Sequence, residues 1–182
     1  MRYKACPEPV DDLECLRSVA AAVPEEADAE ASCCARLVES TDLPDEDEAA
    51  DWLVFLRALG LAEETDGGRF RRSPGSRHAP SADRLAESFR DRVYLADEVL
   101  AALEGADRLV DAGVVLGRIR PHIPPGRRTA GPGSGGPDTE ADVDAAWREH
   151  VGRLLEWAVV LGLATRLDGG YVSTDVDAPE GR

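Results

Sequence analysis

The sequence predicts a mainly helical protein with small β-hairpins, an α+β arrangement built from two similar halves in tandem. A repeated pattern supports this. Leu-Gly-Leu-Ala at 59–62 is followed after three residues by Asp-Gly-Gly at 66–68, and the same two motifs return with the same spacing at 161–164 and 168–170. A second observation is that apolar residues precede each repeat at helical spacing. Each half should therefore contain a helix that leads into a tight hairpin.

The residues around each repeat define the end of the helix and the hairpin. Gly60 and Gly162 stand where a left-handed residue closes a helix. Asp-Gly is a strong hairpin signal, because both central residues of the favoured turn take positive φ. One face of each helix is apolar: Trp52, Phe55, Leu56 and Leu59 in the first half, and Leu154, Trp157, Ala158 and Leu161 in the second.

The first half contains signals for three helices before its hairpin. Asp11 and Asp12 cap a helix that continues to Val23, where Pro24 ends it. A second helix is expected over 28–40. Pro44 and the acidic residues after it favour a third over 45–59, since carboxylates stabilise the first turn of a helix.

The second half repeats this order with an insertion. A helix is expected over 82–103, a second over 108–119, and a third from the cap at Thr139 to Leu161. The proline- and glycine-rich stretch near 124–138 predicts a disordered insertion, since it contains too few apolar residues to pack. The expected organisation is a first domain over 9–74, a linker over 75–81, a second domain over 82–175 and a flexible tail over 176–182.

The composition is strongly acidic. Within 182 residues, 36 acidic residues outnumber 21 basic ones, the net charge is −15, and Lys4 is the one lysine. An acidic, arginine-biased chain resembles proteins of salt-loving archaea, in which the acid excess solvates the surface; an acidic partner-mimicking surface is the alternative. The N-terminal residues do not resemble a signal peptide and the apolar runs are short, so a soluble cytoplasmic protein without membrane contact is expected.

Catalytic and metal-binding patterns are missing from the sequence. The cysteines Cys6, Cys15, Cys33 and Cys34 have no Cys-x-x-Cys spacing and no neighbouring histidine, so small reduced core residues are favoured over a zinc site. The histidines have no nucleophile or carboxylate at a catalytic spacing. We therefore expect no enzyme activity, no cofactor and no metal.

Three helices followed by a two-stranded wing are the order of a winged helix-turn-helix domain. On the repeated Leu-Gly-Leu-Ala and Asp-Gly-Gly motifs, both halves resemble the tandem winged-helix domains of haloarchaeal transcriptional regulators. The resemblance covers the chain apart from the first ten residues, the linkers and the tail. It implies a fold used by many DNA-binding regulators, and also by modules that bind only protein.

If the chain binds DNA as a regulator, arginines at winged-helix contact positions would contact phosphate. Two stretches are free of acidic residues, one in the first wing and one in the turn before the last long helix. Such arginines could equally solvate loops and pair with neighbouring acids. The candidate DNA-binding residues are Arg69, Arg71, Arg72, Arg77, Arg118, Arg120, Arg127, Arg128, Arg148 and Arg153.

The third helix of the first half predicts a different partner. Its outer face begins with carboxylates, which would repel phosphate, so a protein-binding adaptor without DNA contact is the alternative function. The candidate protein-binding residues are Asp45, Glu46, Asp47, Glu48 and Asp51. The sequence does not indicate a DNA site, an effector or an oligomeric state.

Overall fold

The computed structural model describes residues 6–77, 80–132 and 139–174; for Ser76 and Arg77 it describes the backbone alone. The chain divides into two compact units, Met1–Tyr94 and Leu95–Arg182. Each unit has its own helices and its own small sheet, and each is considered separately below.

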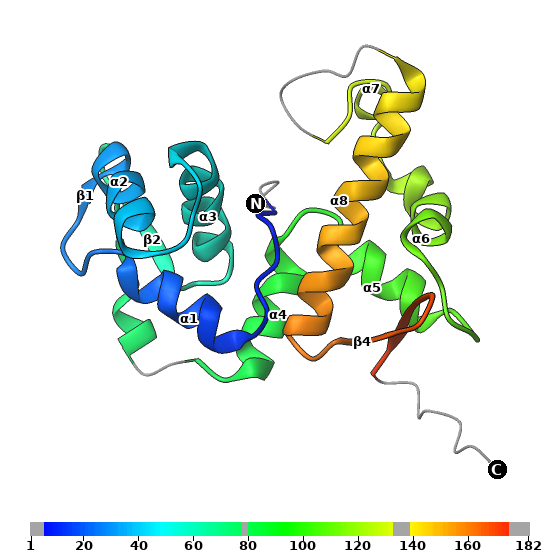
Figure 1. Cartoon of the computed structure of the whole chain (residues 1–182), viewed down its shortest axis with the longest axis horizontal. Helices are drawn as coiled ribbons and strands as arrows, with labels where there is room; N and C mark the ends of the chain where they lie inside the picture. The colour runs from blue at the N-terminus through cyan, green and yellow to red at the C-terminus, as the bar shows by residue number, and fades with distance from the viewer. Residues whose placement is uncertain (1–5, 78–79, 133–138, 175–182) are drawn as a thin grey trace. The chain divides into compact units, whose positions relative to one another are not determined.

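Unit 1 combines packed helices with an antiparallel sheet (Figure 1). Helix α2 packs against α3, and the hairpin formed by β2 and β3 carries β1 along its second edge. This is the order of a winged-helix domain, with one helix added after the wing. The elements are α1 (Leu13–Ala22), β1 (Asp28–Ala29), α2 (Glu30–Ser40), α3 (Glu46–Ala58), β2 (Ala62–Thr65), β3 (Arg69–Arg72), η1 (Pro74–Arg77) and α4 (Ala82–Arg92).

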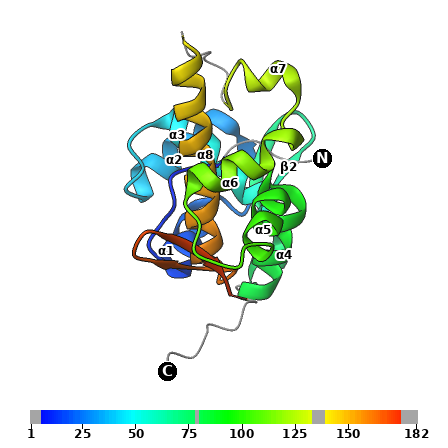
Figure 2. The same cartoon turned by 90° about the vertical axis from the view of Figure 1, so that its right-hand side faces the viewer.

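Unit 2 has the same plan (Figure 2). Helices α5, α6 and α8 pack against one another, and a hairpin of β4 and β5 follows α8. Val110 pairs with Tyr171 of β5 through two backbone hydrogen bonds of 3.1 and 2.8 Å, and so takes the place that β1 has in unit 1. The elements are α5 (Ala96–Glu104), α6 (Ala112–Ile119), η2 (Arg120–His122), α7 (Pro125–Arg128), α8 (Glu140–Val160), β4 (Ala164–Leu167) and β5 (Gly170–Ser173).

The predicted repeat is confirmed in detail. Gly60 and Gly162 both have φ 76°. The amide that follows each glycine donates to a carbonyl one turn back, Leu61 to Leu56 and Leu163 to Ala158, both at 2.8 Å. This closing pattern satisfies carbonyl groups that the helix end would otherwise leave unpaired. Phe55 and Trp157, which occupy equivalent positions, are both fully buried.

Side-chain caps begin several of these helices, as the sequence predicted. Asp12 accepts a hydrogen bond from the Cys15 amide at 2.9 Å, and Asp45 accepts one from the Glu48 amide at 2.9 Å. Thr139 accepts one from the Asp142 amide at 3.2 Å. Both hairpin turns lie where the sequence predicted them, but their conformation differs from the expected one, in which the aspartate also has positive φ. In the described residues of both turns, positive φ is confined to glycines.

The expected single helix over 82–103 is wrong. Leu95 takes a left-handed conformation with φ 65°, and the chain forms α4 and α5 on either side of it. Helix α4 packs against α3 in unit 1, where the Phe89 ring meets Phe55 edge-on at 6.4 Å. The division between the units therefore falls after Tyr94, whereas the sequence had suggested a linker over 75–81.

The expected disorder near 124–138 is also wrong for the part that the structure describes. Residues 124–132 form α7 and a turn that returns toward α8, with Gly131 buried at φ 79°. The Trp147 indole N–H donates to the Arg127 carbonyl oxygen at 3.2 Å, and this bond fixes the segment to α8. Residues 133–138 and the predicted tail over 176–182 lie outside the described part of the chain.

We expect Gly170→Ala to destabilise unit 2 by about 1–3 kcal/mol, because a methyl group there overpacks a filled space. A Cβ atom at Gly170 would lie 2.5 Å from the Val110 carbonyl oxygen, and backbone cannot move aside as a flexible side chain can. Chemical denaturation would measure the loss. Gly152→Ala is the matched control: nothing lies within 4 Å of its Cβ position, and alanine is favoured in a helix. Equal stability of the two variants would contradict this account of the wing.

Candidate nucleic-acid interface

The arginines of the first wing are bonded within unit 1. Arg71 lies directly opposite Glu63 in the sheet, and its Nε donates to the Glu63 carboxylate at 2.5 Å. Arg72 pairs with Glu25 at 2.5 Å, and Arg69 donates to the Ala27 carbonyl oxygen at 2.5 Å. Although this stretch contains no acidic residue, the fold brings glutamates from other segments against two of its arginines. The side chain of Arg77 lies outside the described part of the chain.

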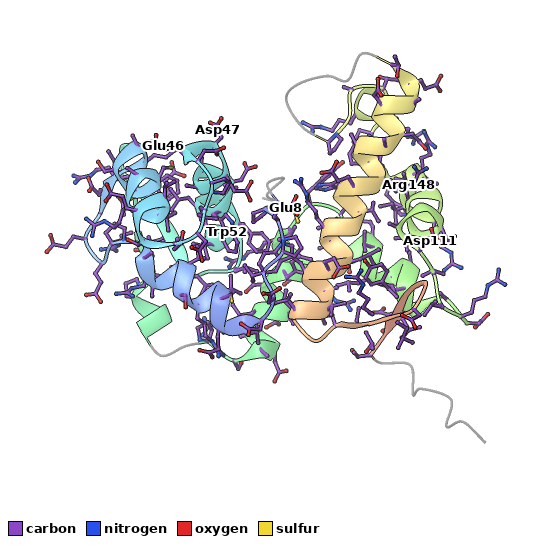
Figure 3. The ribbon with its side chains drawn as sticks, viewed as in Figure 1. Glu8, Glu46, Asp47, Trp52, Asp111 and Arg148 are labelled. Atoms are coloured by element: carbon purple, nitrogen blue, oxygen red, sulfur yellow. The ribbon has the colours of Figure 1, made fainter. Side chains whose placement is uncertain are left out.

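The exposed side of α3 is acidic over its first turns. Asp45 caps the helix, and Glu46 and Asp47 are exposed at its first turn (Figure 3). Glu48 accepts a hydrogen bond from the Glu8 amide at 3.1 Å, and Asp51 is exposed one turn later. Most of the remaining helix is buried: Ala49, Trp52, Leu53, Phe55, Leu56 and Ala58. Because it offers phosphate mainly carboxylates, α3 is poorly suited to enter a DNA groove.

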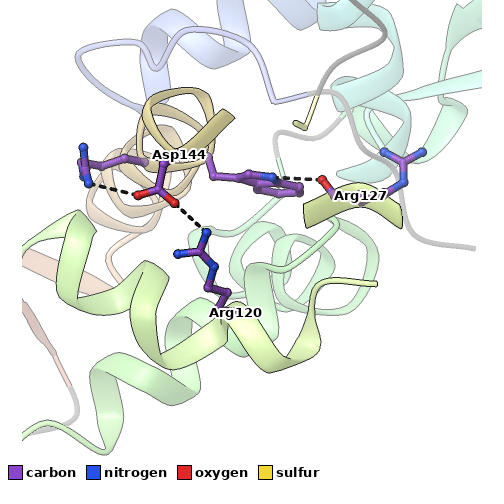
Figure 4. A network of polar contacts seen from close by, with 5 residues as sticks. Arg120, Arg127 and Asp144 are labelled. Atoms are coloured by element: carbon purple, nitrogen blue, oxygen red, sulfur yellow. Dashed lines mark hydrogen bonds and ion pairs between the residues drawn. The ribbon is translucent and has the colours of Figure 1, made fainter. Parts of the chain in front are cut away.

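In unit 2, one carboxylate joins arginines from two elements (Figure 4). Arg120 of η2 donates from Nη2 to Oδ1 of Asp144 at 2.8 Å, and Arg148 donates from Nη2 to Oδ2 at 3.4 Å. The side chains of Arg120 and Arg148 remain 48% and 55% exposed. Two positive charges therefore meet one negative charge at a solvent-accessible place on α8.

Neighbouring arginines of unit 2 add to this positive surface. Arg118 donates to the Ala102 carbonyl oxygen at 2.7 Å. Arg128 donates to the carbonyl oxygens of Ile123 and Pro121 at 2.7 and 3.1 Å. Such bonds position a guanidinium without cancelling its charge. The side chain of Arg127 is directed away from Asp144, and within the described residues no ion pair is found for it (Figure 4).

We define the basic surface as Arg118, Arg120, Arg127, Arg128 and Arg148. Of the predicted arginines, these five come from one region of unit 2, formed by the ends of α6, η2, α7 and the first half of α8. Arg153, also predicted, lies further along α8 and pairs with Glu149 at 2.7 Å. In the basic surface, Arg120 and Arg148 share one carboxylate, and the other three arginines have no ion pair in the described part of the chain; exposed Glu140, Asp142 and Glu149 lie on the same half of α8.

A family model described as the Halobacterial double winged helix domain matches residues 1–178 of the chain. The chain belongs to this family. The comparisons with curated proteins and with solved structures find no match. Membership confirms the resemblance that the repeated motifs predicted, and it agrees with the two winged-helix units described above.

The second wing of this double winged helix protein rests on α8. The Tyr171 hydroxyl donates to Glu156 at 2.5 Å, and Arg166 pairs with the same carboxylate at 2.9 Å. Burial, followed by the Glu156 carboxylate, raises the pKa of Tyr171 to about 12. This wing therefore uses its polar side chains to hold its own position.

Burial shifts the pKa of two further titratable groups. Burial lowers the pKa of His150 to about 4, and burial raises that of Cys34 to about 11. Cys6, Cys15, Cys33 and Cys34, all in the described part of the chain, form no disulfide bond. Over residues 6–77, 80–132 and 139–174, no group of three or more histidine, cysteine or acidic side chains could hold a metal ion, and no helix is long and apolar enough to cross a membrane.

The sequence analysis allowed that the arginines pair with acids, but it did not identify which acids. Asp144 stands one helical turn before Arg148, so helical spacing alone could have suggested that pair. The position of Asp-Gly-Gly in the hairpin could likewise have placed Glu63 opposite Arg71. No local signal could have found Glu25 beside Arg72, since the pairing depends on the tertiary fold.

Proposed function

We propose that this double winged helix protein binds duplex DNA as a transcriptional regulator, and that the basic surface of unit 2 makes the main contact. The observation that carries the proposal is the gathering of five arginines there, three of which have no ion pair in the described part of the chain. Arg120 and Arg148 share one carboxylate, Asp144, and Arg118 and Arg128 donate to backbone carbonyl oxygens, although Asp97 and Glu98 line a pocket together with Arg118. Guanidinium groups are well suited to phosphate because they are planar and always charged.

The position of this surface in the fold supports the same function. It includes the first half of α8, the helix that corresponds to the groove-reading helix of a winged-helix domain. Helix α7 lies beside it, fixed by the bond from Trp147 to Arg127. A DNA duplex could therefore contact α8 and the neighbouring basic segment α7 of the same unit.

The acidity of the whole chain does not oppose this proposal at high salt. At about 1 M salt the Debye length is ~3 Å, so a net charge of −15 spread over the chain is screened from DNA. The same screening weakens long-range attraction, which leaves direct arginine contacts and shape as the main sources of affinity. The first wing contributes less in this proposal, because Arg71 and Arg72 already pair with glutamates.

The test replaces Arg118 and Arg127 together with glutamine. If both contact phosphate, the plot of log K against log salt becomes less steep by about two, since each contact contributes a slope of ~0.9. The loss of affinity caused by the substitutions should then be about 20-fold greater near 0.2 M salt than near 1 M salt. Fluorescence anisotropy with genomic DNA fragments would measure this, over the salt range in which circular dichroism shows both proteins folded.

Arg17→Gln with Arg36→Gln is the matched control, because it removes the same charge from α1 and α2 of unit 1. Its salt dependence should equal that of the wild type. If the wild type binds DNA but the Arg118 and Arg127 variant keeps its slope, the basic surface is not the contact. If the wild type binds no fragment, the regulator proposal is wrong.

The second candidate is an adaptor that binds a basic protein surface through α3. The exposed carboxylates of Glu46, Asp47 and Asp51 favour it, because they lie on the helix that many winged-helix proteins use for DNA. Replacing Glu46 and Asp47 by their amides separates the candidates. Loss of a bound protein partner in this variant would support the adaptor. An unchanged set of partners would contradict it, whatever the effect on DNA affinity.

A further inference from the structure

Asp144 has a feature that a simple surface ion pair lacks: its two carboxylate oxygens are used by arginines from different elements. Oδ1 accepts from Arg120 of η2, and Oδ2 accepts from Arg148 of the same helix α8 (Figure 4). Each guanidinium donates through Nη2 and keeps further N–H groups for another partner. The two side chains are thus held together while about half of each stays accessible to solvent.

We infer that Asp144 is a positioning residue that orders Arg120 and Arg148 for reading guanine edges in the major groove. The inference rests on the proposed function, and it explains how the protein would prefer some DNA sequences over others. Arginine to guanine O6 and N7 is the commonest specific protein–DNA contact, and its two hydrogen bonds form only when the guanidinium is aligned with the edge of the base. A free arginine loses rotamer freedom when it binds, so a carboxylate that fixes it beforehand makes the correct contact easier.

The same carboxylate must weaken attraction to DNA of any sequence, because it cancels one positive charge near the phosphates. Asp144 should therefore have opposite effects on two measurable quantities. It should increase discrimination between sequences and decrease affinity for duplex DNA in general. A residue that only supports the fold would not separate these quantities.

The experiment compares the full-length wild type with Asp144→Asn on two duplexes of equal length, one of alternating dG and dC and one of alternating dA and dT. The wild type should prefer the dG-dC duplex by about 5- to 150-fold, the discrimination of one good bidentate pair. In Asp144→Asn this preference should disappear, while affinity for the dA-dT duplex should rise. Anisotropy titrations at several salt concentrations provide both quantities.

Asp142→Asn is the matched control. Asp142 lies in the first turn of the same helix and contacts Thr139, with no ion pair to an arginine in the described part of the chain. This variant loses the same charge, so general affinity should rise slightly, but the preference for dG-dC should stay. Circular dichroism on both variants checks that α8 is retained.

The outcomes separate the two claims. If the wild type binds neither duplex, both the proposed function and this inference are overturned. If it binds both equally, or if Asp144→Asn keeps the preference, DNA binding stands and the role of Asp144 is overturned. A loss of binding to both duplexes in a folded Asp144→Asn protein also overturns it, because that result indicates a structural role.

Discussion

Replacing Trp157 with alanine is expected to lower the free energy of unfolding of unit 2 by about 3–5 kcal/mol, the range for truncating a large core aromatic. Trp157 is fully buried in α8, next to Ala158 and Leu154, which are also fully buried. The surrounding structure would relax only partially around the cavity left by the indole ring. Denaturant titration followed by circular dichroism would measure the shift in midpoint.

Two comparison variants make the result specific. Leu167→Ala removes a side chain that is 51% exposed at the second wing, so stability should change by no more than about 0.5 kcal/mol. Phe55→Ala removes the equivalent core residue of unit 1. If the units unfold separately, Phe55→Ala and Trp157→Ala will each shift a different transition. A shift below about 1 kcal/mol for Trp157→Ala would contradict its place in the core.

Lowering the pH from 6.5 toward 4 is expected to destabilise the protein through His150. Its side chain is 9% exposed and meets the Trp147 ring edge-on at 5.8 Å. Burial, followed by the charge of Arg153, lowers the pKa of His150 to about 4, whereas an unfolded histidine has its ordinary value near 6.5. Between these values the unfolded state binds the proton and the folded state does not.

This difference in proton binding makes the folded protein less stable as the pH falls. The stability associated with neutral His150 is complete above pH 6.5 and decreases as pH falls toward 4, by at most about 3 kcal/mol. His150→Leu removes the titrating group, so its stability should decline less over the same range. Because acidic residues titrate at the lower end, the readout is the difference between variant and wild type. Parallel stability curves for the two proteins would show that His150 is not responsible.

Local features of the sequence predicted most of the winged-helix plan. Asp12, Asp45 and Thr139 cap helices through bonds that span three residues, and Gly60 and Gly162 end helices by their own backbone preference. Interactions of this kind depend on neighbouring residues alone. They are therefore visible in a single sequence, and the repeat made them visible twice.

The features that the sequence missed depend on contacts between distant residues. The apolar stripe continues through Val93, Ala96 and Leu100 without glycine or proline, so nothing local marks the break at Leu95. Similarly, the composition of 124–132 hides the bond from Trp147 that fixes α7. The sequence showed which arginines were candidates for DNA contact. It did not show which of them are neutralised by ion pairs, because Glu25, Glu63 and Asp144 reach them through the fold.

The attachment of α4 to unit 1 determines where this chain can be cut. A fragment that ends in the proline- and serine-rich stretch before residue 80 would lack Leu85 and Phe89, both buried in the intact unit. Their absence would uncover the Phe55 side of α3 and leave an apolar patch on an otherwise acidic particle. Such patches promote self-association. An autonomous first half therefore has to continue through Tyr94, even though composition alone places its boundary earlier.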